Sequence, residues 1–417
     1  MNLIDKYNNK FESSIYILFN SLLDRGTFFI LYVFLTHIVA KTEYGFIVSV
    51  FAFTNIIMAV FDFGLPFYIQ RETASGNSIK LEINTILYIK SVSFLLFIPL
   101  PIMYFASTAE INIPLIIIIS TINFSWGISS IFNAVLYGSD AYKKSSFYLL
   151  ISRVVLFIAF IVLLPIKPGV EILLLPFILS FFVHFLLFKN HLKTRGIILF
   201  KGHLETSLVR KTFRSSFPMG LGVIFVLIYD RADILILQKI SGLEIVAFYS
   251  VAYSLYRAMQ IFSSMILVPK YSVFSKSFSQ NRTLSRSELI HVSFSLLLLG
   301  LIIIFIMFVF PDFLIKLFYS SSYLPSSKVL RYLSIGFGGV LMNNFTGIIL
   351  NSIRKEKVPA FTTGVGAVIN IVLNIILITK IGIWGAVITT VITEYIVFIF
   401  QFGFLFYYKR RKVFVLN

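Results

Sequence analysis

Long hydrophobic stretches follow one another along the chain from Ser14 to Tyr408, separated by short polar segments. A helix needs roughly 20 mostly apolar residues to cross the hydrocarbon core of a bilayer. The pattern therefore predicts an all-α, polytopic membrane protein with little chain left for a soluble domain. We expect twelve spans, near residues 14–39, 46–69, 83–105, 113–137, 146–166, 171–190, 216–238, 245–268, 292–310, 328–351, 360–380 and 383–408.

Composition narrows the class further. Charged residues make up only 13% of the chain, whereas about a quarter of residues are charged in soluble proteins. The absence of cysteine excludes disulfides, thiolate metal sites and a cysteine nucleophile. The net charge of +18 does not indicate nucleic-acid binding, because the basic residues lie in loops between spans, as the positive-inside rule requires. We expect no nucleic-acid partner and no metal site.

The distribution of Lys and Arg predicts an orientation. With the N-terminus inside, cytoplasmic segments hold about 24 of the 36 basic residues and outer loops about 7. Both termini are then cytoplasmic, and the first span is expected to remain uncleaved. The segment from Lys189 to Arg214 is the most basic, and we expect it to lie on an anionic membrane surface as a linker.

An Asp-Arg pair occurs twice, at Asp24-Arg25 and at Asp230-Arg231, about half the 417-residue chain apart. A short turn and a similar span follow each pair. Six spans in each half would place both halves in the same orientation, as parallel repeats. The predicted organisation is an N-terminal six-helix lobe (1–200) and a C-terminal six-helix lobe (201–417), joined by the basic linker at about 189–215 and surrounding a central cavity.

Sequence motifs do not favour an enzyme. The chain has no GxxxxGK[ST] phosphate loop and no HExxH motif, and no segment outside the spans exceeds about thirty residues. His184 and His191 are interpreted as interfacial rather than as ligands. The glycine pairs Gly220/Gly222 and Gly364/Gly366 are interpreted as sites of close helix packing.

Ionisable residues inside the spans are the informative set, because such residues almost always face a bundle interior or a water-filled cavity. They either form ion pairs that fix helix packing or serve a functional site. The position of Asp62 near the end of its span favours a structural or interfacial role, whereas Lys90 and Arg153 could equally snorkel to the cytoplasmic face. The set comprises Asp24, Arg25, Asp62, Lys90, Arg153, Asp230, Arg231, Asp233, Arg257 and Glu394.

Asp230 and Asp233 are three residues apart, so on a helix they share a face. Two acids in a partly desolvated cavity repel each other, which tends to hold one protonated and makes them a candidate ion-coupling site. Alternatively, Asp230 pairs with an Arg of another helix and Asp233 makes a packing contact. Asn370 and Asn374 also have two interpretations. Their amides could join helices through hydrogen bonds or could line a polar path for a sugar, and the helix-joining role is favoured.

Several motifs in order resemble those of a known family. The stretch 229–235, YDRADIL, followed by GLE at 242–244 and AFYSVAY at 247–253, resembles the seventh-helix signature of polysaccharide flippases. These are the Wzx-type O-antigen transporters of the multidrug/oligosaccharidyl-lipid/polysaccharide exporter superfamily. Further resemblances lie at residues 42–45, 61–65, 369–374 and 381–386.

The resemblance implies a bacterial inner-membrane flippase with two six-helix lobes. It would move an undecaprenyl-diphosphate-linked oligosaccharide, for O-antigen or a similar surface polysaccharide, by alternating access. No cofactor is implied beyond a proton or sodium gradient. Membrane lipids, a polysaccharide polymerase and a chain-length regulator are the implied partners.

The resemblance and the polar residues inside the spans together give the candidate site residues. Arg25 and Arg257 are the candidates for the diphosphate, because a guanidinium binds phosphate oxygens in a bidentate fork. Asp24, Asp230, Arg231 and Asp233 are the candidates for ion coupling or the cavity. Further cavity candidates are Lys90, Arg153, Asn370, Asn374 and Glu394.

Three other functions remain as alternatives. A lipid II flippase would use a similar cationic cavity but usually has more spans. A multidrug exporter should present acids and aromatic side chains, whereas the mid-span arginines disfavour cationic drugs. A membrane polymerase or glycosyltransferase would need a large periplasmic loop, which the sequence lacks.

Overall fold

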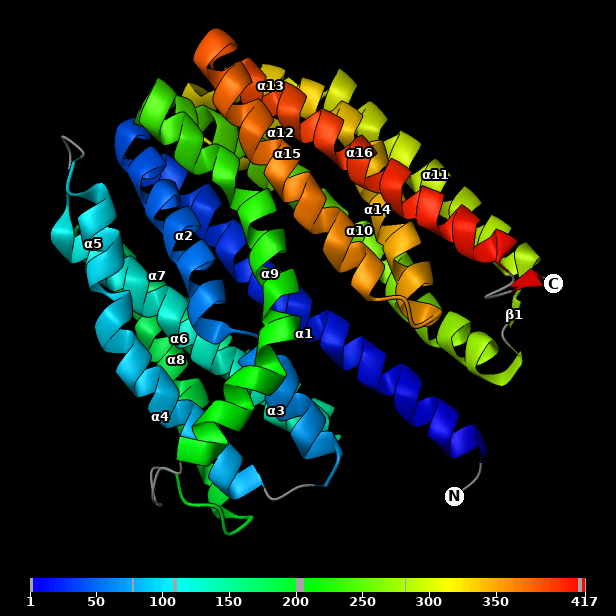
Figure 1. The fold of residues 1–417 in the computed structure, drawn as a ribbon. Coiled ribbons are helices and arrows are strands. Elements are labelled where there is room, and N and C mark those ends of the chain that lie inside the picture. The colour runs from blue at the N-terminus through cyan, green and yellow to red at the C-terminus, as the bar shows by residue number, and fades with distance from the viewer. Residues whose placement is uncertain are drawn as a thin grey trace. The chain divides into compact units, whose positions relative to one another are not determined.

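A computed structural model describes residues 3–76, 79–107, 111–199, 206–281, 283–411 and 415–416, with positions 3–14, 79, 206, 272, 281 and 416 described by their backbone alone. Nearly all of this part of the chain is helical, which confirms the predicted all-α class (Figure 1). The part of the basic linker between residues 200 and 205 lies outside the described residues.

The elements follow in chain order. The α-helices are α1 (Leu3–Ile38), α2 (Lys41–Asp62), α3 (Leu65–Ala74), α4 (Ile79–Phe97), α5 (Pro99–Phe105), α6 (Ile113–Gly138), α7 (Tyr142–Leu163), α8 (Val170–Lys193), α9 (Thr206–Ser241), α10 (Leu243–Asn281), α11 (Arg286–Val309), α12 (Pro311–Phe318), α13 (Ser326–Leu333), α14 (Phe337–Ser352), α15 (Lys357–Ile381) and α16 (Ile383–Arg410). Short 3-10 helices are η1 (Leu164–Ile166), η2 (Ser321–Tyr323) and η3 (Ser334–Gly336), and the strands are β1 (Thr283–Leu284) and β2 (Val415–Leu416).

Eleven segments in the described part of the chain are long and apolar enough to cross a membrane. They correspond to eleven of the twelve predicted spans. The remaining prediction, 216–238, falls within α9, which is not among the eleven. The chain therefore has the hydrophobic helices of a multi-pass membrane protein.

The predicted span at 46–69 is wrong at its end. α2 ends at Asp62 because Phe63 and Gly64 adopt left-handed backbone conformations, with φ of 44° and 77°. α3 then begins at Leu65 with a proline in its first turn, a position that proline tolerates. A continuous apolar pattern thus conceals a turn between two helices.

Contacts divide the chain into two compact units that are not consecutive halves. Unit 1 contains residues 1–27 and 49–227, and unit 2 contains residues 28–48 and 228–417. Helices α1, α2 and α9 each contribute one segment to each unit. The division into lobes at residue 200 stays a prediction.

Unit 1 is built around α6, which packs against α3, α4, α7 and α8 (Figure 1). Its core includes Leu65, Tyr68 and Phe188, all completely buried. The rings of Phe132 and Phe188 stack with their centroids 4.3 Å apart. Aromatic and aliphatic side chains therefore fill the space between these helices.

Unit 2 is built around α14 and α16, with α15 packed on α16 and with α10 and α11 packed on α14 (Figure 1). A core that includes Phe274, Leu296 and Leu350 lies between these helices. The strand β1, after α10, pairs in parallel with β2 near the C-terminus. This two-strand pair adds a β interaction to an otherwise helical unit.

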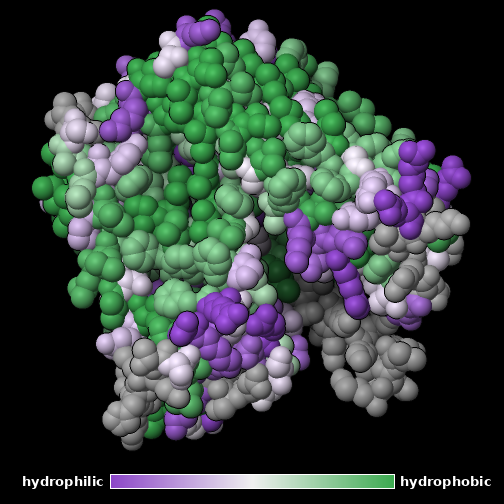
Figure 2. Space-filling model, in the orientation of Figure 1, coloured by the Kyte–Doolittle hydropathy of each residue, from purple (hydrophilic) through white to green (hydrophobic). Residues whose placement is uncertain are grey.

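Large apolar side chains remain exposed along the helices. Leu95 and Met103 are both 72% exposed. Figure 2 shows hydrophobic residues over most of the drawn face, with hydrophilic residues gathered in separate patches. A soluble monomer rarely exposes so much contiguous apolar surface, so these faces fit a lipid environment.

A close backbone approach in unit 1 requires a glycine at position 220. A Cβ atom on Gly220 would lie 2.4 Å from the carbonyl carbon of Phe63 and 2.8 Å from the amide nitrogen of Gly64. These neighbours are backbone atoms and cannot rotate away. The absence of a side chain therefore lets α9 contact the turn between α2 and α3.

We expect Gly220→Ala to lower the free energy of unfolding by about 1–3 kcal/mol, the usual cost of overpacking. Thermal unfolding in detergent measures the change. Gly403→Ala on α16 is the matched control, because a Cβ there meets nothing within 4 Å. Equal melting temperatures for Gly220→Ala and the control would contradict the proposed packing.

Candidate functional site

Asp230 of α9 forms the centre of a charged cluster in unit 2. Its carboxylate lies 2.9 Å from the Arg257 guanidinium of α10 and 3.3 Å from Nε of Arg231. The Tyr253 hydroxyl donates a hydrogen bond of 2.7 Å to the same carboxylate. Two guanidinium groups therefore share one carboxylate.

Helical spacing explains this arrangement. Tyr253 and Arg257 are four residues apart on α10, so both side chains project from one face of that helix. Asp230 is buried, but 37% of the Arg257 side chain remains exposed. A negatively charged group could therefore approach Arg257 while Asp230 holds it in place.

Asp233 has different partners, although it shares a helical face with Asp230. Tyr249 donates a hydrogen bond to its carboxylate, and the backbone amide of Ile234 donates another of 2.8 Å. The Tyr249 hydroxyl also lies 3.2 Å from the hydroxyl of Thr390 on α16. Asp230 thus pairs with an Arg of another helix, which is the arrangement that the sequence offered as the alternative to an ion-coupling site. A role for Asp233 in ion coupling stays a prediction.

Three of the remaining predicted residues lie on α15 and α16. The Asn374 amide donates to the side-chain oxygen of Asn370 at 2.8 Å, and Asn370 donates to Thr393 of α16 at 3.3 Å. Glu394 is also buried on α16, and its carboxylate accepts a 2.7 Å hydrogen bond from the Asn343 amide of α14. These polar groups connect α14, α15 and α16 within unit 2.

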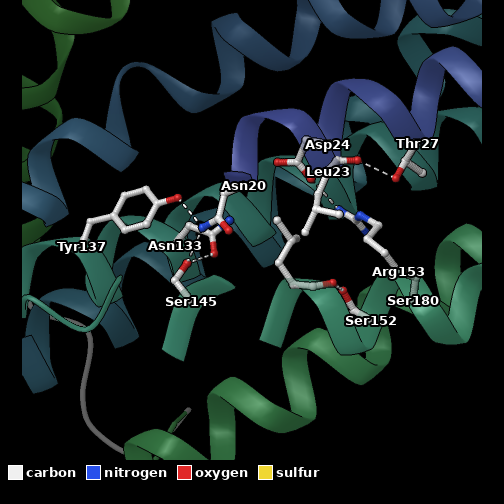
Figure 3. A network of polar contacts seen from close by, with 11 residues as sticks. Asn20, Leu23, Asp24, Thr27, Asn133, Tyr137, Ser145, Ser152, Arg153 and Ser180 are labelled. Atoms are coloured by element: carbon white, nitrogen blue, oxygen red, sulfur yellow. Dashed lines mark hydrogen bonds and ion pairs between the residues drawn. The ribbon is translucent and has the colours of Figure 1, made fainter. Parts of the chain in front are cut away.

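A second polar cluster lies in unit 1 (Figure 3). The Arg153 guanidinium of α7 lies 2.8 Å from the Asp24 carboxylate of α1 and donates a 2.8 Å hydrogen bond to Ser180 of α8. The guanidinium also stacks over the Trp126 ring, 4.0 Å from its centroid. Because Arg153 is buried and paired, the alternative that it snorkels to the membrane surface is wrong.

The same correction applies to Lys90 of α4. Its ammonium group pairs with Asp62 at the end of α2 and donates to the Phe61 carbonyl at 3.2 Å. Only 1% of the Lys90 side chain is exposed. Asp62 therefore takes part in a buried ion pair, in line with the structural role that its sequence context favours.

Sequence reasoning missed one polar network in unit 1. The Asn20 amide donates to Tyr137 at 2.7 Å and to Ser145 at 3.2 Å, and Ser145 donates to Asn133 at 2.8 Å (Figure 3). The spacing of Asn20 and Asp24 could have indicated this network, because the two residues are four positions apart and therefore share a face of α1. This face of α1 thus bonds to α6 and α7.

The two arginines predicted to hold the diphosphate belong to different units. Arg25 is exposed on α1 in unit 1, and Arg257 lies in unit 2. The structure places Arg257 in a cluster with Asp230 and Arg231. In the described part of the chain, no group of three or more His, Asp or Glu residues could hold a metal ion.

Comparison with known proteins places the chain in a family. The family described as "Polysaccharide biosynthesis protein" matches residues 11–278, and a second family, MatE, matches residues 218–376. An uncharacterized membrane protein of Methanocaldococcus jannaschii is 30% identical over 205 residues, which make up 47% of this chain. The match spans 40% of that relative's own length.

Solved structures share the fold. An inward-facing multidrug resistance MATE transporter of the MOP superfamily is 14% identical, with a TM-score of 0.67 over 96% of this chain and 94% of its own. The lipid II flippase MurJ in an inward closed conformation is 17% identical, with a TM-score of 0.65 over 96% and 87%. A MOP superfamily transporter from Pyrococcus furiosus is 15% identical, with a TM-score of 0.63 over 96% and 94%.

These proteins are transporters rather than enzymes, which agrees with the absence of catalytic motifs noted in the sequence. The family match covers well over half of the chain, and the fold is that of MOP superfamily transporters. The chain is a multi-pass membrane protein that belongs to the polysaccharide biosynthesis protein family.

Proposed function

We propose that the chain is a flippase for an oligosaccharide linked to a polyprenyl lipid through a diphosphate. The observation that carries the proposal is the exposed part of Arg257, held by Asp230 within the helices of unit 2. The family match to polysaccharide biosynthesis proteins supports the class of substrate. The fold shared with a lipid II flippase supports transport of a lipid-linked sugar as the type of activity.

The physical task explains why cations belong inside such a protein. A diphosphate carries negative charge that hydrocarbon does not solvate, so it crosses a membrane only where protein groups replace water. An arginine offers two parallel donors to phosphate oxygens and retains its charge when partly buried. Arg257 is our first candidate for this contact, and Arg25 is the second.

The transport cycle that we propose is alternating access, with the lipid tail remaining in the bilayer. The oligosaccharide would leave the cytoplasmic leaflet of a bacterial inner membrane and enter the outer leaflet, with both termini cytoplasmic. It would serve O-antigen or a similar surface polymer, together with a polymerase and a chain-length regulator. Asp233 is better suited than Asp230 to bind a coupling proton or sodium ion, because two arginines already compensate the charge of Asp230.

A multidrug exporter is a second candidate, and one observation favours it. Buried acids and tyrosines lie together in unit 2, where Asp233 bonds to Tyr249 and Asp230 bonds to Tyr253. Acidic and aromatic groups attract cationic drugs. The two guanidinium groups on Asp230 oppose such a ligand, so we rank this function second.

Reconstituted vesicles test the proposal directly. Purified protein should move a fluorescent undecaprenyl-diphosphate oligosaccharide between leaflets, measured by its accessibility to a membrane-impermeant quencher. Protein-free vesicles give the background, and a fluorescent organic cation tests the second candidate. Transport of the cation without movement of the lipid-linked sugar would replace the flippase with an exporter.

A further inference from the structure

Gln260 of α10 is a buried amide whose nitrogen has no hydrogen-bond partner in the described part of the chain. Only 7% of the residue is exposed, and its Nε2 atom is buried. Gln260 follows Arg257 by three positions, so the two side chains are neighbours on α10, with their Cα atoms roughly 4.5 Å apart along the helix axis. An unpaired donor therefore lies next to the guanidinium that is our first candidate for the diphosphate.

Two contacts fix α10 against α14, which lies beside it (Figure 1). The rings of Tyr256 and Phe337 have their centroids 5.9 Å apart, and the Asn344 amide donates a 3.1 Å hydrogen bond to the Ser263 hydroxyl. The second contact comes seven residues after the first on both helices. The two helices therefore run in the same direction and stay in contact over about two turns.

Asn343 of α14 has an unpaired acceptor at nearly the level of Gln260. Its amide nitrogen donates to the Glu394 carboxylate at 2.7 Å and to the Glu394 backbone carbonyl at 2.9 Å. Its Oδ1 atom is buried and has no hydrogen-bond partner among the described residues. Counted from the contact between Tyr256 and Phe337, Gln260 comes four residues along α10 and Asn343 six along α14, a difference of roughly 3 Å along the helix axes. An unpaired donor and an unpaired acceptor thus lie at similar heights on adjacent helices.

Joining helices does not account for these two atoms. Buried amides in membrane proteins often connect helices through hydrogen bonds, as Asn344 does with Ser263. In the described residues, by contrast, the Gln260 nitrogen donates to no group and the Asn343 Oδ1 atom accepts from none. A buried polar group without a partner is unfavourable, so both atoms favour a ligand that supplies one.

We propose that Gln260 and Asn343 bind a hydroxyl group of the sugar that is joined to the diphosphate. The inference rests on the proposed function, because a diphosphate on Arg257 brings its first sugar close to the next turn of α10. A hydroxyl both accepts and donates hydrogen bonds, so it matches the unpaired donor of Gln260 and the unpaired acceptor of Asn343. The two amides are neutral and suit an uncharged sugar, whereas the guanidinium suits phosphate. The pair thus lets the protein distinguish a lipid that carries a sugar from the bare carrier lipid.

Gln260→Met tests this role, because methionine has an unbranched side chain of similar length and no donor. The substitution breaks no hydrogen bond of the Gln260 nitrogen within the described residues, so the fold should persist. Loss of one neutral hydrogen bond corresponds to about a 2- to 12-fold loss of affinity. We expect this loss for a lipid diphosphate that carries a sugar and no loss for the same lipid without the sugar.

The experiment titrates full-length protein in detergent with two probes, undecaprenyl diphosphate and undecaprenyl-diphosphate N-acetylglucosamine, by isothermal calorimetry. Wild type should bind the second probe more tightly than the first. Gln260→Met should reduce that preference by the factor given above while binding the first probe as wild type does. Gln280→Met is the matched control and should keep the wild-type preference, because Gln280 is exposed on the same helix.

The outcomes separate the inference from the proposed function. Equal affinities of wild type for the two probes would overturn the sugar contact and leave the flippase proposal standing, as would an unchanged preference in Gln260→Met. Failure of wild type to bind either probe would overturn both. Gln260→Leu is the second variant if Gln260→Met does not fold. If neither variant folds, the Gln260 amide is needed for packing, which also contradicts its role as a ligand contact.

Discussion

Arg257→Ala is expected to abolish transport of the lipid-linked oligosaccharide while normal amounts of protein remain in the membrane. The substitution removes a guanidinium that lies 2.9 Å from the Asp230 carboxylate. Part of this guanidinium side chain is exposed in the wild-type protein and can therefore be reached by a ligand. Hydrogen bonds to charged groups contribute about 1.5–3 kcal/mol, which corresponds to a loss of roughly 10- to 150-fold in affinity. The vesicle assay and the surface polymer of a complemented deletion strain both measure the effect.

Asp230 keeps two partners in this variant, so the fold should persist. Arg231 and Tyr253 remain in contact with its carboxylate. Folding is checked by thermal unfolding and by the amount of protein in the membrane.

Two further variants make the result specific to Arg257. Arg257→Lys preserves the charge but loses the two-donor fork, so transport should be intermediate. Arg71→Ala removes an exposed arginine on α3 that pairs with Glu72, and transport should equal wild type. Wild-type transport by Arg257→Ala would exclude this side chain as the diphosphate contact.

Asp62→Ala is expected to lower the free energy of unfolding more than Gly220→Ala or Glu244→Ala does. It leaves the Lys90 ammonium group buried without its carboxylate, since only 1% of that side chain is exposed. Removing one partner of a buried ion pair typically costs about 3–5 kcal/mol, because the remaining charge is uncompensated. Two contacts of the ammonium group remain and offset a small part of this loss of stability. They are the Phe61 carbonyl and the Phe124 ring, whose centroid lies 5.6 Å from the ammonium. Thermal unfolding and the yield of monodisperse protein in detergent measure the loss.

A double variant separates charge from packing. Lys90→Met in the Asp62→Ala background removes the uncompensated ammonium and retains much of the side-chain volume, so stability should return toward wild type. Glu244→Ala is the control, because its partner Lys41 and Glu244 itself are 34% and 53% exposed. An exposed pair contributes at most about 1 kcal/mol. If Asp62→Ala were no more damaging than Glu244→Ala, the buried pair would not be a main source of stability.

The hydrophobic pattern of the sequence was sufficient to predict most membrane spans, because crossing a membrane depends on the local hydrophobicity of the chain. About twenty consecutive apolar residues form a span wherever they occur, and eleven of the twelve predicted spans correspond to described helices that are long and apolar enough to cross a membrane. The pattern failed where a turn is itself apolar. Phe63 and Gly64 continue the hydrophobic run, yet their left-handed conformations end α2.

Pairing between charged side chains depended on packing and could not be predicted from spacing. Arg153 and Asp24 are separated by 129 positions, and three-dimensional contact between α1 and α7 joins them. The snorkelling alternative was open for Arg153 and Lys90 because each side chain is long enough to reach water. Burial excluded it in both cases.

The chain's own sequence determined that this is a polytopic, all-helical membrane protein with ionisable residues inside its spans. Hydrophobic length and charge are properties of the residues themselves, so a linear pattern contains them. Tertiary structure alone decided that Asp230 holds Arg257, that Lys90 pairs with Asp62, and that Glu394 has a neutral donor. These outcomes depend on which helix faces meet, and a few ångströms of separation decide whether a buried charge is compensated.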